Sequence, residues 1–468
     1  MMERMLQLSW QVPFGAFALK LDPLSLMFLI AITVLVVSAG LYGIGYLRAY
    51  RTKPLGLHAF FYGVLAAALF LIVTANNVIL FLGAWEVMSV AVYFLIVFHD
   101  ERPSARKAGF LYLIASHCGT FLLFLMFFLM AHAAGSMEFS AISRVPFPPV
   151  LAGIIFCLAL AGFGVKAGLL PLHIWLPHAH PEAPSHVSAL LSGVAIKMGI
   201  YGICRVLWIV REFPDWCAYA LMIIGISSGI MGVLYALGQH ELKKLLAYHS
   251  IENIGIIVLG LGVGLLGRTH DMPFVAALGF GGGLLHVLNH SLFKGLLFLS
   301  AGAVIQKVHT GDMDRLGGVA RTMPATSTLF LVGAWSICGL PVFNGFISEF
   351  IIFFALFQGL FSVPLYGAVF CAVGILALAV MGALALACFT KVYGTVFCGT
   401  PREASHRDVA PGEKEASSWM MAPMFVLAAI CLWIGLAPYT MAGAALAGGA
   451  YAMRAAFSLM DLDRVLMP

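Results

Sequence analysis

Apolar runs of roughly 18 to 25 residues recur along nearly the whole chain, separated by short polar segments. That is the length an α-helix needs to cross a bilayer. We therefore predict an all-α polytopic membrane protein with about twelve spans, and 439–460 as an undecided thirteenth. The predicted spans are 24–47, 57–75, 78–98, 108–132, 150–173, 185–210, 216–237, 245–266, 274–305, 325–357, 364–397 and 419–436.

One polar stretch, Gly164–Lys197, interrupts this pattern. Its four prolines each lack an N–H and restrict the preceding residue, so a helix that begins near Gly153 is predicted to break. A break at membrane depth survives only when it is buried in protein or lines a wet cavity. With Lys166 just before the break, the stretch indicates an ion path, and the alternative is a re-entrant loop whose polar groups satisfy one another. The histidines and the glutamate around the break could relay protons to the surface or could cap loops: His173, His178, His180, Glu182 and His186.

A second break is predicted at Gly339–Gly345, followed by Glu349. Each predicted break lies in the fourth helix of a unit of five helices. Because five is an odd number, the second unit starts on the opposite side of the membrane from the first, and the two units would have opposite orientations. We therefore expect two inverted five-helix repeats. The expected organisation is an N-terminal region with the first span (1–56), the first repeat (57–210), the second repeat (216–397), and a cytoplasmic loop with the C-terminal helix or helices (398–468).

The basic residues of the loops are divided unequally between the two sides, and by the positive-inside rule the richer side faces the cytoplasm. The N-terminus is then expected outside, with the protein in the cytoplasmic membrane. One side carries Arg48, Arg51, Lys53, Arg102, Arg106, Lys107, Lys243, Lys244, Lys307, Arg315, Arg321, Arg402, Arg407 and Lys414, and the other Arg4, Lys20, Arg144, Arg211 and Arg268.

Six titratable side chains lie inside six different predicted spans, which is more than packing requires. Snorkelling toward a span end could explain Lys391 and Lys197, but it does not easily explain Glu86 or Lys294. The six are Glu86, Lys166, Lys197, Lys294, Glu349 and Lys391.

His286, His290 and Lys294 follow one another at steps of four, which places them on one helix face over about 12 Å. Two imidazoles and an amine in a row are suited to passing protons. A zinc site at the two histidines and a hydrogen-bonded core pair are the alternatives, although the HxxxH spacing lacks the glutamate of a metalloprotease motif.

Three further polar residues are interpreted as structural. His117 stands alone on an apolar face and is expected to be a hydrogen-bonded core histidine. His249 and Glu252 are assigned to the first turn of a span, where a carboxylate is favourable without any function.

A mechanism follows if Glu86 and Lys166 face each other, because each then holds the other charged. Separating them would let the lysine release its proton toward Lys197, the histidine and lysine row and Glu349.

Redox centres are not indicated in this chain. Its nine cysteines are scattered singly without a CxxC or a Cys/His cluster, and it has neither a P-loop nor a GxGxxG motif after a strand. The net charge of +5 is spread over loops and does not indicate nucleic-acid binding.

The motifs around these residues resemble the antiporter-like membrane subunits of complex I, Mrp antiporters and group 4 hydrogenases. AYHSIENIG and LNHSLFKGLLFLSAGAVI are most similar to the large membrane subunit of group 4 hydrogenases. The matching segments, in order, are WEVMS, GVKAGLLPLHIWLPHAHPEAPSHVSALLSG, IKMGIYG, ELKKLLAYHSIENIG, HVLNHSLFKGLLFLSAGAVI and GLPVFNGFISEF.

The resemblance implies a proton-translocating subunit of a membrane-bound redox complex, with antiporter-like, anchor and peripheral redox subunits as partners. Iron–sulfur, nickel–iron or flavin centres are expected only in those partners, and the ion is H⁺ or Na⁺. An Mrp-type antiporter module driven by an ion gradient and a scaffold that no longer moves protons remain alternatives. The implied relay residues are Glu86, Lys166, Lys197, His286, His290, Lys294 and Glu349.

Overall fold

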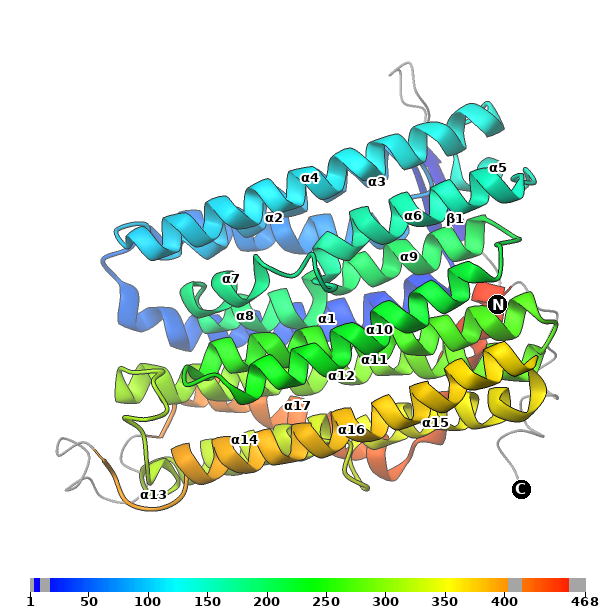
Figure 1. Cartoon of the computed structure of the whole chain (residues 1–468). Helices are drawn as coiled ribbons and strands as arrows, with labels where there is room; N and C mark the ends of the chain where they lie inside the picture. Colours follow the sequence, from blue (N-terminus) through cyan, green and yellow to red (C-terminus); the bar gives the residue numbers. More distant parts are fainter. Residues whose placement is uncertain (1–3, 9–16, 403–414, 454–468) are drawn as a thin grey trace.

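The computed structural model describes residues 4–8, 17–402 and 415–453, and in it long helices lie with their axes nearly parallel or antiparallel (Figure 1). Within these residues, twelve helical segments are long and apolar enough to cross a membrane, and each coincides with a predicted span. The all-α polytopic fold is therefore confirmed. The predicted span 325–357 consists of two helices, the second of which has the spanning length.

The helices of the first half are α1 (Pro23–Tyr46), η1 (Leu47–Tyr50), α2 (Leu55–Thr74), α3 (Val78–Ile96), η2 (Val97–His99), α4 (Pro103–Ala134), α5 (Phe139–Ile142), α6 (Pro149–Ala167), α7 (Leu176–Glu182), α8 (Ser185–Leu190), η3 (Leu191–Ala195) and α9 (Lys197–Ile209). Those of the second half are α10 (Trp216–Leu237), α11 (Leu242–Thr269), α12 (Pro273–Val308), α13 (Val319–Thr322), α14 (Pro324–Ile337), α15 (Asn344–Ser362), α16 (Leu365–Val396), α17 (Ser418–Leu436) and α18 (Tyr439–Met453).

The centre of the bundle is formed by α8–α9, α11 and α12. The apolar windows of 185–209 and 242–269 are wholly buried, whereas only 33% of the windows in α2 and α16 are buried. In Figure 1 the α2–α4 group and the α14–α16 group lie on opposite sides of this centre. Polar groups on the central helices are therefore shielded from lipid by other helices.

Two features at the ends of the chain add to the prediction. A two-stranded antiparallel sheet of β1 (Arg4–Leu8) and β2 (Phe17–Leu21) precedes α1, with Arg4 opposite Leu21. The hydropathy pattern does not predict this sheet, because its strands of five residues are much shorter than a membrane span. At the other end α18 has 15 residues, and its predicted continuation to Met460 lies outside the described residues.

An ion pair joins the start of α1 to α9. Asp22 accepts a hydrogen bond from the Ser25 backbone N–H (2.8 Å) as the N-cap of α1, and Arg205 Nη1 donates to its second carboxylate oxygen at 2.6 Å. Burial alone would raise the pKa of Asp22, but the charge and hydrogen bonds of Arg205 outweigh burial and hold this pKa below its usual value. This pair holds two segments together that are 183 residues apart.

The broken helices α6 and α14–α15 each occupy the fourth position of a five-span unit, as the spacing predicts. The inverted symmetry between the units and the domain boundaries drawn from it stay predictions.

Candidate functional site

The first break begins directly after Lys166. Gly168 ends α6 in the left-handed conformation (φ 77°), and its N–H bonds to the Gly164 carbonyl at 2.9 Å. The chain then runs irregularly to α7, so the predicted interruption is confirmed. Lys166 consequently lies in the last turn of α6, where the helix dipole favours a cation.

The ammonium group of Lys166 is buried and is held by two hydroxyl groups. It donates to Tyr112 Oη at 2.6 Å and to Ser89 Oγ at 3.0 Å, and it lies 5.7 Å from the centre of the Trp85 ring. Because both hydroxyl acceptors are uncharged, the Lys166 amine can gain or lose a proton without breaking an ion pair.

Glu86 pairs with His117 rather than with Lys166. The Glu86 carboxylate lies 3.1 Å from His117 Nδ1, and these side chains are 30% and 49% exposed. The interpretation of His117 as a core histidine is therefore wrong, since α4 turns it outward. Glu86 is near enough to Lys166 to interact electrostatically, but the two are not in direct contact.

Lys197 follows a π-helical turn, η3, that was not predicted. The Ile196 N–H bonds back five residues to the Leu191 carbonyl at 3.1 Å, and the Lys197 ammonium donates to the Ser192 carbonyl. Such turns are frequent at functional sites because they disturb the regular ladder of carbonyls. Lys197 is 1% exposed, so snorkelling does not explain it.

His286, His290 and Lys294 form a buried row on α12, as their spacing predicts. The two imidazole rings are nearly parallel, 6.3 Å apart, and Lys294 Nζ donates to the Leu246 carbonyl at 2.6 Å. Both ring nitrogens of His290 are buried without a protein partner.

The nitrogens of His286 are engaged by neighbouring polar side chains. Nδ1 lies 2.9 Å from Ser348 Oγ and Nε2 lies 3.2 Å from Asn253 Oδ1. Neither nitrogen is available to a metal in this arrangement. Across the part of the chain that is described, no three His, Cys, Asp or Glu side chains cluster as a metal site.

Glu252 is a buried group, and its predicted position in the first turn of a span is wrong. It is the eleventh residue of α11, not part of the first turn, and is 1% exposed. It hydrogen-bonds to His249 and interacts electrostatically with Lys294. The helix begins earlier than expected, with Glu241 as its N-cap, so the dipole does not explain a carboxylate at Glu252.

Glu349 lies at the second break, which is confirmed between α14 and α15. Gly339 adopts a left-handed conformation (φ 61°), and a Cβ there would come within 2.5 Å of a Glu349 carboxylate oxygen. The glycine thus makes room for the carboxylate, which is 8% exposed.

Electrostatic interactions connect most of these groups into one line through the centre of the bundle. Lys197 interacts with Lys294 and His286, Lys294 interacts with Glu252, and Glu252 interacts with Glu349. Among the described residues, neither a hydrogen bond nor an ion pair joins Lys166 to Lys197. Their helices nevertheless touch, since a Cβ on Gly199 would lie 2.5 Å from the Phe163 carbonyl oxygen.

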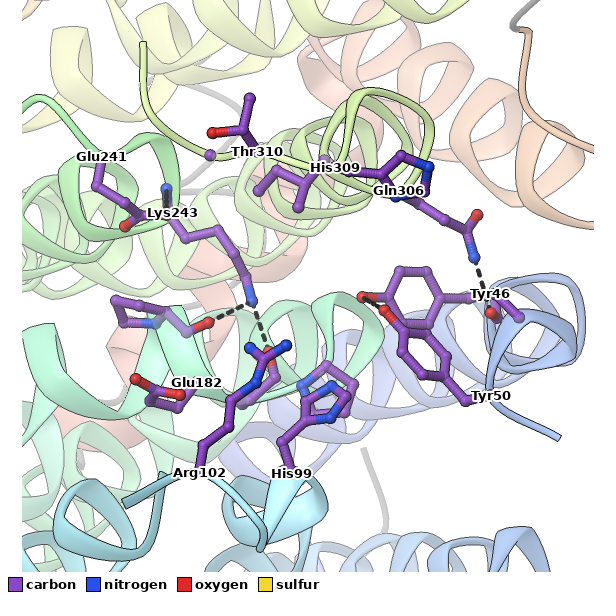
Figure 2. A pocket seen from close by; sticks show the side chains of 16 residues that line it. Tyr46, Tyr50, His99, Arg102, Glu182, Glu241, Lys243, Gln306, His309 and Thr310 are labelled. Carbon is purple, nitrogen blue, oxygen red and sulfur yellow. Dashed lines mark hydrogen bonds between the residues drawn. The ribbon is translucent and has the colours of Figure 1, made fainter. Parts of the chain in front are cut away.

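A cavity of about 560 Å³ opens beside the first break, at the end of the bundle that carries most loop lysines and arginines. Figure 2 shows Arg102, Glu182 and His99 around it, with Lys243 reaching in to donate to the Pro181 and Ala183 carbonyls at 3.0 and 2.5 Å. Burial raises the pKa of Glu241 in its wall, against the opposing charge of Lys243.

His180 lies between this cavity and the central row. It precedes Pro181 of the cavity wall, and its ring stacks on Phe298 at 4.8 Å, the ring that Lys294 approaches at 5.8 Å. Both nitrogens of His180 are buried without a protein partner. Since a neutral imidazole carries one donor and one acceptor, water is the expected partner.

The other residues predicted as a possible proton entry or secondary relay lie in surroundings that differ from those of His180. His173 stacks on Tyr235, His178 is exposed, and Glu182 lines the cavity. Lys391 donates to the Leu237 carbonyl at 2.8 Å, which satisfies the C-terminal end of α10 and favours a structural role.

His186 is hydrogen-bonded to His58, a residue outside the predicted candidate site. The Nε2 atoms of His58 and His186 lie 2.8 Å apart, and both residues are buried. The two residues are 128 positions apart, so no local pattern pairs them.

Two interrupted helices and a buried line of titratable groups in a polytopic bundle define the architecture of an ion-translocating membrane protein. The chain belongs to the NADH:quinone oxidoreductase/Mrp antiporter transmembrane family, whose family model matches residues 75–376. It is thus a multi-pass integral membrane protein.

Relatives and a solved structure agree with this assignment. The chain is 40% identical to hydrogenase-4 component B of Escherichia coli K12 over 90% of its own length and 63% of the relative's. It is 37% identical to formate hydrogenlyase subunit 3 of the same organism, over 90% and 67% respectively. It therefore spans about two thirds of these relatives. A chain of the Mrp complex from Dietzia sp. DQ12-45-1b shares the fold, with a TM-score of 0.80, 20% identity, and 96% and 87% of the two chains covered.

Proposed function

We propose that this chain is a proton-translocating, non-redox subunit of a membrane-bound respiratory or hydrogenase-type complex, in the cytoplasmic membrane with its N-terminus outside. The observation that carries the proposal is the buried line from Lys197 through Lys294 and Glu252 to Glu349. Charges in hydrocarbon-flanked helices are costly, and their usual function is ion movement.

The cavity at the first break is the proposed cytoplasmic inlet. Protons enter past Glu182 and Lys243, reach His180 through water, and pass to Lys294 and Lys197. Lys166 responds to changes at Glu86, whose charge acts on it across a short gap. Because no direct contact joins Lys166 to Lys197 and α6 packs closely on α9 at Gly199, transfer between the two lysines requires their side chains to move.

The Glu86 and His117 pair indicates where a partner subunit docks. Both side chains are partly exposed halfway along α3 and α4, where lipid would otherwise surround them. A neighbouring membrane subunit that covers the pair would couple its own state to Lys166. Redox cofactors reside in partner subunits.

The redox-coupled assignment is preferred to an ion-gradient antiporter because the two hydrogenase-type relatives are 40% and 37% identical to this chain, whereas a Na⁺/H⁺ antiporter subunit A1 of Staphylococcus haemolyticus is 30% identical. Transport in liposomes without an electron donor separates the two, since only the antiporter is driven by a Na⁺ gradient.

The test is proton translocation per turnover in the intact complex after Lys166→Ala or Glu349→Ala. Both changes are expected to lower the ratio, while the matched control Lys391→Ala leaves it unchanged. Unaltered translocation in both Lys166→Ala and Glu349→Ala would refute the proposal.

A further inference from the structure

An apolar groove between α1 and α2 lies apart from the titratable line. Its volume is about 340 Å³, and Gly40, Gly43 and Ile44 of α1 face Leu55 and Ala59 of α2 across it. The two glycines keep it open on the α1 side, since no side chain projects from either of them. The His58 and His186 pair forms part of its wall, with the two Nε2 atoms hydrogen-bonded to each other.

Two arginines stand at the mouth of this groove. Arg48 and Arg51 are exposed, and within the described residues neither side chain has a hydrogen-bond or ion-pair partner. Lys53 differs, because Asp100 and Glu101 both bind its ammonium group. The groove therefore combines an apolar body with a positive mouth that none of the described side chains neutralises.

The length of the groove matches one leaflet of a bilayer. Gly40 and Arg51 are eleven residue steps apart, which is about 16 Å at the rise of an α-helix. Half of a hydrocarbon core of about 30 Å is roughly 15 Å. With the arginines at headgroup level, the Gly40 end of the groove lies near the middle of the membrane.

We propose that this groove is a binding site for one anionic phospholipid of the leaflet at the basic end of the bundle. The phosphate pairs with Arg48 and Arg51, and an acyl chain lies along Gly40, Gly43 and Ala59. The Nε2 atoms of the histidine pair already hydrogen-bond to each other, and only His186 Nδ1 of this pair is buried without a protein partner. The positive charge of the two arginines favours an anionic headgroup. The apolar wall of the groove favours a ligand that also has an acyl chain.

The test titrates the purified full-length chain with phosphatidylglycerol or phosphatidylcholine and counts bound lipids by native mass spectrometry. Two arginines near a headgroup predict a preference for the anionic lipid of about tenfold to thirtyfold. Arg48→Gln combined with Arg51→Gln is expected to abolish this preference. The control Lys53→Gln keeps it, since that lysine is already neutralised by carboxylates.

Ala59→Trp tests the apolar half separately, because it fills the groove and leaves both arginines in place. It is expected to remove the tightly held phosphatidylglycerol. Inorganic phosphate at equal concentration should not displace the lipid from the wild-type chain.

Three results would overturn the proposal. These are an unchanged preference in the double arginine variant, displacement by inorganic phosphate, which would indicate a free-anion site, and a photo-crosslinker at position 59 that captures a polypeptide in native membranes. The arginines are exposed, so the double variant is expected to fold, and its thermal unfolding midpoint checks this.

Discussion

Replacing His180 by phenylalanine should separate proton transfer from stability. The ring stacks on Phe298 at 4.8 Å with an interplanar angle of 18°, a geometry that phenylalanine can keep. The change removes two buried nitrogens that have no protein partner. Because water is the expected partner of these nitrogens, an apolar ring of the same shape should leave stability unchanged or raise it by no more than about 1–3 kcal/mol.

Proton transfer should respond in the opposite direction. A positioned proton carrier typically contributes a factor of about 10² to 10⁴, so transfer through this inlet should slow by at least about 100-fold. The assay is proton translocation per turnover in the intact complex. Unfolding is followed through the reactivity of buried thiols such as Cys204 and Cys431.

His178→Phe is the matched control, because His178 belongs to the same short helix but is exposed. It should leave translocation unchanged. Normal pumping by His180→Phe would refute the route through His180. A loss of stability of several kcal/mol would show instead that His180 has a structural partner and that the reasoning from its unpaired nitrogens is wrong.

Two further predictions concern other buried contacts. Tyr112→Phe removes the 2.6 Å hydrogen bond from Lys166, which is worth about 1.5–3 kcal/mol for a charged donor. The variant should still assemble, as checked by purification of the complex, but a pumping assay should show slower proton translocation. Asp22→Asn keeps a capping side chain but leaves Arg205 buried without a counter-charge, and should lower the free energy of unfolding by about 3–5 kcal/mol in denaturant titrations. Because the pKa of Asp22 is lowered on folding, the stabilisation from this pair is full above about pH 4 and is lost as the pH falls further; pH-independent stability between pH 5 and 2 would contradict it.

Much of the fold follows from local sequence properties. Every predicted span is present, because transfer of an apolar run into a bilayer depends on that run alone. Both breaks are also where prolines and glycines place them, since these residues alter the backbone itself. The row on α12 follows from helical periodicity in the same way.

The pairing of charged groups was less accessible to sequence analysis. The depth of Glu252 differs from the prediction because α11, capped by Glu241, begins three residues before the predicted span, which makes Glu252 the eleventh residue of the helix. His117 was misassigned because its face of α4 could not be oriented without α3. The η3 turn has no clear sequence signal, although it positions Lys197.

The sequence by itself determined which segments cross the membrane, where two of them break, and which titratable side chains lie at membrane depth. Only the tertiary structure decided that Lys166 rests on hydroxyl groups, that Glu86 meets His117, and that His58 meets His186. The physical reason is range: hydropathy and backbone restriction act within a few residues, whereas a buried polar group takes its partner from whichever helix packs against it.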